Sequence, residues 1–264
     1  MRCEAVDDNV MRLRWEREQT LLGLAPGTPD EELAVGGLAA LAIPPTVRIC
    51  VLPGDPDAVA VPPQDPATVI PQLITVPCGR QLPRHAMVRG TSSGYVGVSY
   101  TGEDGLWRSF AAVRWHGGVD FFLGDQGGRE WDIPAAAFRR RVVYLQIAVC
   151  WAWAAFDLQR EMVERFTAGG PFRAIVAVAH TSGASLGTFG AGCAEPGRTG
   201  FWDQPTAVDQ HVLLLEDLAE WPDAVGVEAL ALRFGARLDL AFGGPGGRHL
   251  DRTGPEAGKF RPRW

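Results

Sequence analysis

Residues 95–123 read YVGVSYTGEDGLWRSFAAVRWHGGVDFFL, and this stretch decides the fold that the sequence predicts. It holds three runs rich in β-branched or aromatic residues, at 95–100, 106–115 and 119–123. Between these runs stand Thr-Gly-Glu-Asp-Gly and His-Gly-Gly, and turn residues between β-rich runs are the usual signal of hairpins. We therefore predict a three-stranded β-meander in this part of the chain.

A long helix is predicted after the meander, over residues 134–166. Apolar residues such as Ile147, Trp151 and Leu158 recur there every three or four positions, which gives the helix one buried stripe. The Gly-Gly-Pro sequence at 169–171 ends it.

Three more strands and a final helix follow. The strands are predicted at 173–180, 185–189 and 207–215, and the helix begins near Asp223 and ends at Gly243. Strands thus precede and follow the long helix, and most neighbours are joined by tight turns. This favours an α+β fold, with an antiparallel or mixed sheet packed on one long and one shorter helix, and with an N-terminal helical piece.

Four parts of the chain are predicted: an N-terminal helical segment at 1–43, a Pro-rich extended segment at 44–90, the α+β domain at 91–244, and a flexible tail at 245–264. Half of the twenty prolines lie between residues 44 and 83. Because each proline fixes φ and removes a backbone donor, long helices and central strands are excluded there. We expect an edge strand or a linker instead.

Composition narrows the class of protein. The net charge of −6 disfavours a general attraction to nucleic acid or to an anionic membrane. The five cysteines form no Cys-x-x-Cys pair, and no two histidines stand three or four residues apart, so we expect neither a metal nor a cofactor. Scattered thiols, an acidic N-terminus in place of a signal peptide, and an apolar stretch at 142–156 too short to span a bilayer predict a cytoplasmic protein without membrane contact.

The sharpest chemical motif is Gly-Ala-Ser-Leu-Gly at 183–187, a G-x-S-x-G sequence. In serine hydrolases this turn lifts the Ser hydroxyl to the end of a strand, beside backbone donors. A hydrolase would use Ser185 as nucleophile, with His211 as base and Asp209 as acid. The glycines that follow the motif do not favour the helix that such a turn should open, so the other interpretation is a Gly-rich hairpin.

Three further groups of residues could bind something. Arg139, Arg140 and Arg141 form a basic run that could contact nucleic acid phosphates, although such runs are more often solvated. Trp151 and Trp153 lie on the long helix, where only one of the two can face the core directly, so the other could line an interface. The Gly-rich sequence at 243–248 follows a helix, and it is typical of a helix stop rather than of a phosphate-binding loop.

Several stretches together resemble a known group of proteins. They are RFTAGGPFR at 165–173, GASLGTFGAGCAEP at 183–196, EDLAEWP at 216–222 and FGARLDLAFG at 234–243. Residues 90–245 resemble the C-terminal half of actinobacterial DNA-binding proteins that carry an N-terminal, Schlafen-type AlbA domain. The AlbA domain itself is not found in this sequence. The resemblance therefore implies an accessory or sensing module.

Three functional hypotheses result. The first is a non-enzymatic binding or interaction module that takes a protein partner or small ligand, or that self-associates. The second is a serine hydrolase that uses Ser185. The third is a regulator that contacts nucleic acid through its arginine clusters.

Overall fold

The computed structural model describes residues 46–53, 86–90, 95–101, 107–114, 117–123, 142–166, 170–179, 181, 184–187, 211–247 and 250. All of them belong to one compact unit, residues 44–264. The predicted N-terminal helical segment at 1–43 and most of the predicted tail at 245–264 lie outside the described residues.

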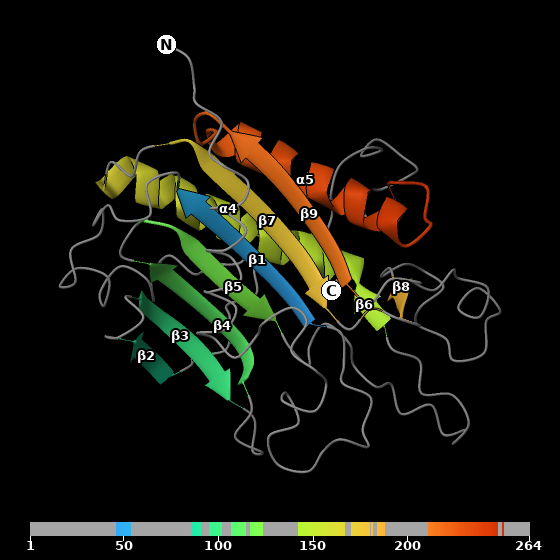
Figure 1. The fold of residues 1–264 in the computed structure, drawn as a ribbon, viewed down its shortest axis with the longest axis horizontal. Helices are drawn as coiled ribbons and strands as arrows, with labels where there is room; N and C mark the ends of the chain where they lie inside the picture. Colours follow the sequence, from blue (N-terminus) through green and yellow to red (C-terminus); the bar gives the residue numbers. More distant parts are fainter. Residues whose placement is uncertain are drawn as a thin grey trace. The chain divides into compact units, whose positions relative to one another are not determined.

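Seven strands form one antiparallel sheet (Figure 1). In spatial order they are β2 (Ala86–Gly90), β3 (Tyr95–Thr101), β4 (Trp107–Arg114), β5 (Val119–Leu123), β1 (Thr46–Pro53), β7 (Phe172–Ala179) and β9 (His211–Leu218). Every pair of neighbours is antiparallel. The predicted meander corresponds to β3, β4 and β5.

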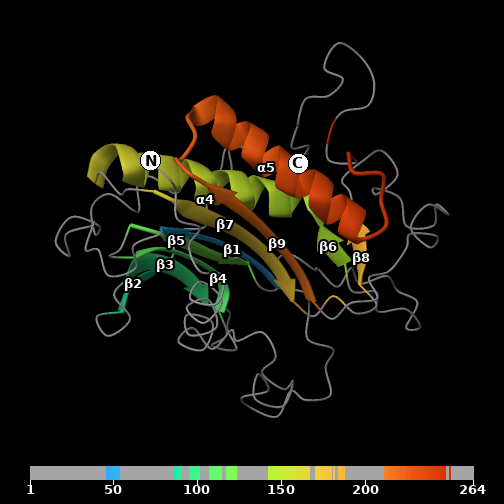
Figure 2. The same cartoon turned by 45° about the horizontal axis from the view of Figure 1, so that its top comes forward.

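Two helices cover one face of this sheet (Figure 2). They are the long helix α4 (Leu145–Phe166) and the shorter helix α5 (Ala224–Ala241). The α+β class predicted from the sequence is confirmed. None of the helices in the described part of the chain is long and apolar enough to cross a membrane.

The start of the long helix differs from its prediction. Residues 142–144 form a short strand, β6 (Val142–Tyr144), which pairs in parallel with β8 (Ser185–Gly187) in a separate two-stranded sheet. The helix begins only at Leu145. A three-residue strand has no periodicity of its own, so the apolar run into the helix concealed it.

The exclusion of central strands from the Pro-rich segment was wrong for β1, which lies between β5 and β7. The reason is local, because no proline stands inside the strand before its last residue, Pro53. The ladder with β5 ends at Val51, whereas Pro53 still pairs with Phe172 of β7. The N–H that Pro53 lacks is therefore not needed by the β1–β5 ladder.

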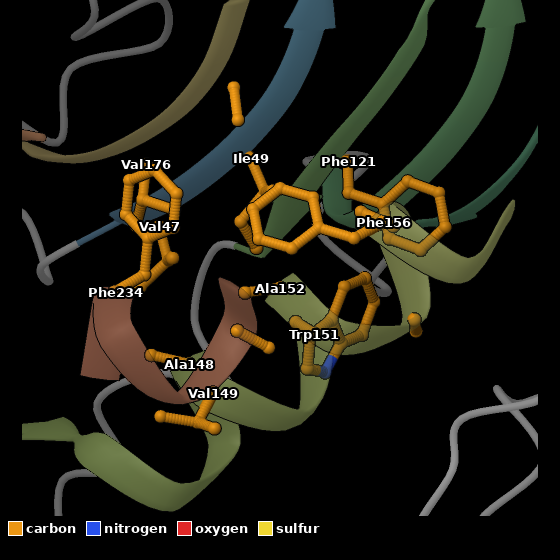
Figure 3. Close-up of a cluster of buried hydrophobic side chains, with 14 of the residues drawn as sticks. Val47, Ile49, Phe121, Ala148, Val149, Trp151, Ala152, Phe156, Val176 and Phe234 are labelled. Atoms are coloured by element: carbon orange, nitrogen blue, oxygen red, sulfur yellow. The ribbon is translucent and has the colours of Figure 1, made fainter. Parts of the chain in front are cut away.

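The core lies between the helices and the sheet (Figure 3). Ile49 of β1 and Phe121 of β5 face Phe156 of α4, and Phe234 of α5 packs at 5.5 Å from the Phe156 ring. All four side chains are essentially fully buried. Truncation of a buried phenylalanine costs about 3–5 kcal/mol, so this packing is a main source of stability.

The connection between β9 and α5 is fastened to α4 by Trp221. Its indole Nε1 donates to the backbone carbonyl of Phe156 at 3.1 Å, and its ring makes edge contacts with Phe156 and Phe172. Two residues later the Asp223 side chain accepts from the amide of Gly226 and caps the first turn of α5. These contacts fix the position of β9 relative to both helices.

Candidate functional site

The residues of the predicted hydrolase site lie on different sheets. Ser185 is the first residue of β8, opposite Val142, so it stands within a strand and not at a turn between a strand and a helix. His211 is the first residue of β9, opposite Ala179 of the large sheet. Asp209 lies outside the described residues. The structure therefore gives no support from geometry to this triad.

The other predicted site residues are distributed as follows. Trp151 is buried and makes an edge contact with the Phe121 ring, so its side chain belongs to the core rather than to an interface. Trp153 is half-buried and packs against the same core. The arginine run at 139–141 lies outside the described residues. Within the described ranges, no three His, Cys, Asp or Glu side chains come together as a metal site.

The Gly-rich loop after α5 is organised by a carboxylate of the protein itself. The Oδ2 atom of Asp239 accepts from the amides of Gly246 and Gly247, each at 3.0 Å. Gly246 has a φ of 87°, a conformation that glycine adopts readily. A carboxylate of α5 thus accepts both amides of this turn, and α5 ends at Ala241, which agrees with the predicted helix stop.

A buried ionic cluster, which the sequence did not predict, lies on the sheet face opposite the helices. Arg48 of β1 donates to both carboxylate oxygens of Asp120 at 2.8 and 2.6 Å, and Arg114 of β4 donates to Oδ2 at 2.8 Å. All three side chains are buried. We call these three residues the Arg–Asp–Arg cluster.

Charge neutralisation explains why this carboxylate is stable in the interior. Burial alone would raise the pKa of Asp120, but the charges and hydrogen bonds of Arg48 and Arg114 outweigh burial and lower the pKa below its usual value. An ionised carboxylate held by two guanidinium groups is a weak base. The cluster therefore joins three neighbouring strands and is poorly suited to proton transfer.

The hydrogen-bond pattern of the sheet shows which backbone groups each strand directs to each neighbour. In an antiparallel sheet, successive residues direct their N–H and C=O groups alternately to the two sides. The amide of Arg114 donates to the carbonyl of Gly118 at 2.7 Å, which sets the alternation in β4 and β5. Asp120 consequently bonds β4, whereas Phe121 bonds β1, where its partner is Ile49.

The same alternation continues through β1 and β7 to β9. Since Ile49 bonds β5, Cys50 bonds β7 and pairs there with Ile175. Val176 then bonds β9, where it pairs with Leu214. The residues of β9 that direct their N–H and C=O groups away from the sheet are therefore the odd-numbered ones, namely 211, 213, 215 and 217.

These outward groups make β9 a candidate binding edge. Among the described residues no strand pairs with its outer side, because β9 ends the strand order. The side chains of Leu213 and Leu215, on the face away from the helices, are 51% and 40% exposed. We call the outward backbone groups of residues 211–217 together with these two leucines the β9 edge.

Arginines of α5 border the β9 edge on its helix side. Arg237 donates through Nη1 to the carbonyl of Leu215 at 2.9 Å, as expected for an outward-directed carbonyl. Its guanidinium also lies 5.4 Å from the centre of the Phe234 ring. Arg233 pairs with Glu216 of β9. The border is therefore cationic, with one carboxylate among two guanidinium groups.

The far end of the β9 edge is fixed by an ion pair across two strands. Arg173 of β7 donates to both carboxylate oxygens of Asp217 at 2.6 and 2.7 Å. These hydrogen bonds lower the pKa of Asp217, and the positive charge of Arg173 adds to the effect, although burial opposes it.

Comparison of the chain with protein-family models, with curated proteins and with solved structures finds no match.

Proposed function

We propose that this chain is a non-enzymatic interaction module that binds an extended segment of a protein partner at the β9 edge. The observation that carries the proposal is the combination of outward N–H and C=O groups with two exposed leucines on one outer strand. Addition of a strand to an open sheet edge is a common mode of peptide recognition, in which main-chain hydrogen bonds supply affinity and alternate side chains supply specificity. An accessory or sensing role, and a cytoplasmic location, form part of the same proposal.

The chemistry of the edge indicates which segment it prefers. An added strand alternates its side chains between the two faces of the sheet. On the outer face they meet Leu213 and Leu215, which favours apolar residues. On the helix face they approach Arg233 and Arg237, which favours acidic residues. We therefore expect a segment with apolar residues on the outer face and an acidic residue on the helix face, and a peptide in which leucine and glutamate alternate is a simple probe of that pattern.

The hydrogen bond of Arg237 competes with this binding. Its hydrogen bond to the Leu215 carbonyl has to be released before an added strand can use that carbonyl. One such bond contributes about 0.5–1.5 kcal/mol, more when the donor is charged. A segment must therefore make several new main-chain bonds at once, and this disfavours short or non-extended competitors.

A peptide titration tests the proposal. The probe is a fluorescein-labelled peptide of alternating leucine and glutamate, followed by fluorescence anisotropy. We expect Leu213→Asp with Leu215→Asp to weaken its binding about tenfold or more, which corresponds to about 1.4 kcal/mol. Aspartates at these positions remove the apolar contact on the outer face and repel the glutamates of the probe, and both native side chains are exposed enough to be replaced without loss of the fold.

Two controls make the titration specific. Val225→Asp changes an exposed apolar residue of α5, 77% accessible, and should leave the affinity unchanged. A peptide of the same composition, with leucines and glutamates in separate blocks, should bind more weakly than the alternating one. Equal binding of both peptides, or equal affinity of the wild type and the double aspartate variant, would show that β9 is not the binding site.

A further inference from the structure

We infer that the partner segment at the β9 edge is β9 of a second copy of this chain, added antiparallel about a two-fold axis at Leu214. This inference rests on the proposed function, because it names the occupant of the same edge. A two-fold interface requires a surface that is complementary to itself. The order of residues in β9 meets that requirement.

The backbone limits the position of the axis. Only the odd-numbered residues of β9 have outward N–H and C=O groups, since the even-numbered ones bond β7. Odd residues of one copy must therefore face odd residues of the other. This condition holds when the axis passes through a residue, and it fails when the axis passes between two residues.

The side chains select one residue for the axis. With the axis at Leu214, Leu213 of each copy faces Leu215 of the other, so both exposed leucines gain an apolar partner. With the axis at Leu215, Leu213 would face Asp217 instead. With the axis at Leu213, only residues 211–215 of each strand would pair. An axis at Leu214 therefore satisfies both conditions. It pairs seven residues of each strand, 211–217, and on the outer face it places no leucine opposite a carboxylate.

The acidic residues of β9 are compatible with the same register. At the ends of the paired segment, Asp217 of one copy stands opposite residue 211 of the other. On the helix face Glu216 stands opposite Val212, so no two like charges of β9 face each other directly. Apolar cross-strand pairs stabilise a sheet, so the two Leu213–Leu215 pairs favour this register.

Sedimentation equilibrium of the full chain tests the association. The wild type should approach twice the mass of one chain as its concentration rises. Leu213→Lys with Leu215→Lys places lysines opposite lysines in this register, and should raise the dissociation constant about tenfold or more. Val225→Lys should associate as the wild type does. Arg237→Ala frees the Leu215 carbonyl and should strengthen the association.

Disulfide trapping tests the register. In the inferred pairing, positions 213 and 215 of opposite copies have Cα atoms about 5.5 Å apart, within the range that a disulfide spans. A mixture of Leu213→Cys and Leu215→Cys chains should therefore form a mixed dimer under mild oxidation. Each variant alone should give only the wild-type background, because like positions lie about 7–8 Å apart on the diagonal.

The outcomes separate this inference from the proposed function. A chain that stays monomeric at all concentrations, yet binds the alternating peptide, would overturn the second copy and keep the binding edge. A dimer that the double lysine variant leaves intact would also overturn it, because another surface would then hold the copies together. If the alternating peptide does not bind and the chain does not associate, both proposals are wrong.

Discussion

The two faces of the large sheet are made from alternate residues of the same strands, yet their chemistry differs. Toward the helices, β1 and β5 contribute apolar side chains such as Ile49 and Phe121. On the opposite face the same two strands contribute Arg48 and Asp120, which form a buried ion pair. At the outer strand β9 this second face carries exposed leucines. The helix face of β1 and β5 is therefore apolar, whereas the other face combines buried apolar residues such as Leu52 with a buried charge cluster, and at β9 it carries the leucines of the proposed binding edge.

The largest effect is expected from Asp120→Ala. It leaves the buried guanidinium groups of Arg48 and Arg114 without their shared carboxylate, and loss of one partner from a buried ion pair costs about 3–5 kcal/mol. Urea unfolding measures the change. Asp157→Ala is the matched control, because it removes a surface carboxylate paired with Arg160 and should cost less than about 1 kcal/mol. Equal losses in both variants would contradict the difference between interior and surface pairs.

Acid should destabilise the protein through the Arg–Asp–Arg cluster. The pKa of Asp120 is lowered in the folded protein, so its contribution is fully present above the unfolded value near 3.8 and is lost as the pH falls through the folded value. Unfolding free energies measured from about pH 5 to about pH 2 should fall less steeply in Asp120→Asn than in the wild type. Parallel curves would show that Asp120 has no part in acid unfolding.

A moderate loss is expected at Gly170, where the chain enters β7. A Cβ atom at this position would lie 2.4 Å from the backbone carbonyl oxygen of Ala219. Backbone atoms cannot move aside as a flexible side chain can, so Gly170→Ala should destabilise the protein by about 1–3 kcal/mol. Thermal unfolding measures this loss. Gly247→Ala is the control, because no atom lies within 4 Å of its Cβ position.

A smaller loss is expected at the start of α5. Asp223→Ala removes the side chain that accepts from the Gly226 amide at 2.9 Å, and loss of an N-cap costs about 1 kcal/mol. Asp223→Ser keeps an acceptor and should recover most of the stability. If serine and alanine gave the same unfolding free energy, the cap would not contribute through this hydrogen bond.

The smallest effect on folding is expected at the β9 edge. Leu213→Lys changes an exposed residue with no buried packing, so the unfolding free energy of the monomer should shift by no more than about 0.5 kcal/mol. Leu214→Lys, on the helix face of the same strand, should destabilise strongly because Leu214 belongs to the core. Similar losses at the two neighbours would contradict the division between the faces.

Local signals in the sequence were sufficient for several elements. The final helix was predicted from Asp223 to Gly243, and α5 spans Ala224–Ala241, because its beginning and end are marked by adjacent residues. The meander was predicted for the same reason. The class of fold followed from the order of these elements.

Contacts between distant residues could not be predicted in this way. Arg48 and Asp120 are 72 residues apart, and nothing near either residue indicates its partner. The central position of β1 was missed because prolines lie on both sides of it in the sequence, although none of them interrupts the β1–β5 ladder. The position of β9 at the edge depends on the order of all seven strands, so its exposed leucines read as ordinary core residues in the sequence.

Residue-resolved amide hydrogen exchange of β9 tests the central claim most directly. In dilute protein the amides of Leu213 and Leu215 should exchange fast, whereas those of Val212, Leu214 and Glu216 should be protected by β7. On binding of the alternating peptide, or of a second copy, Leu213 and Leu215 should become protected as well. Protection of these two amides in the dilute monomer, or no change on binding, would contradict an open edge at β9.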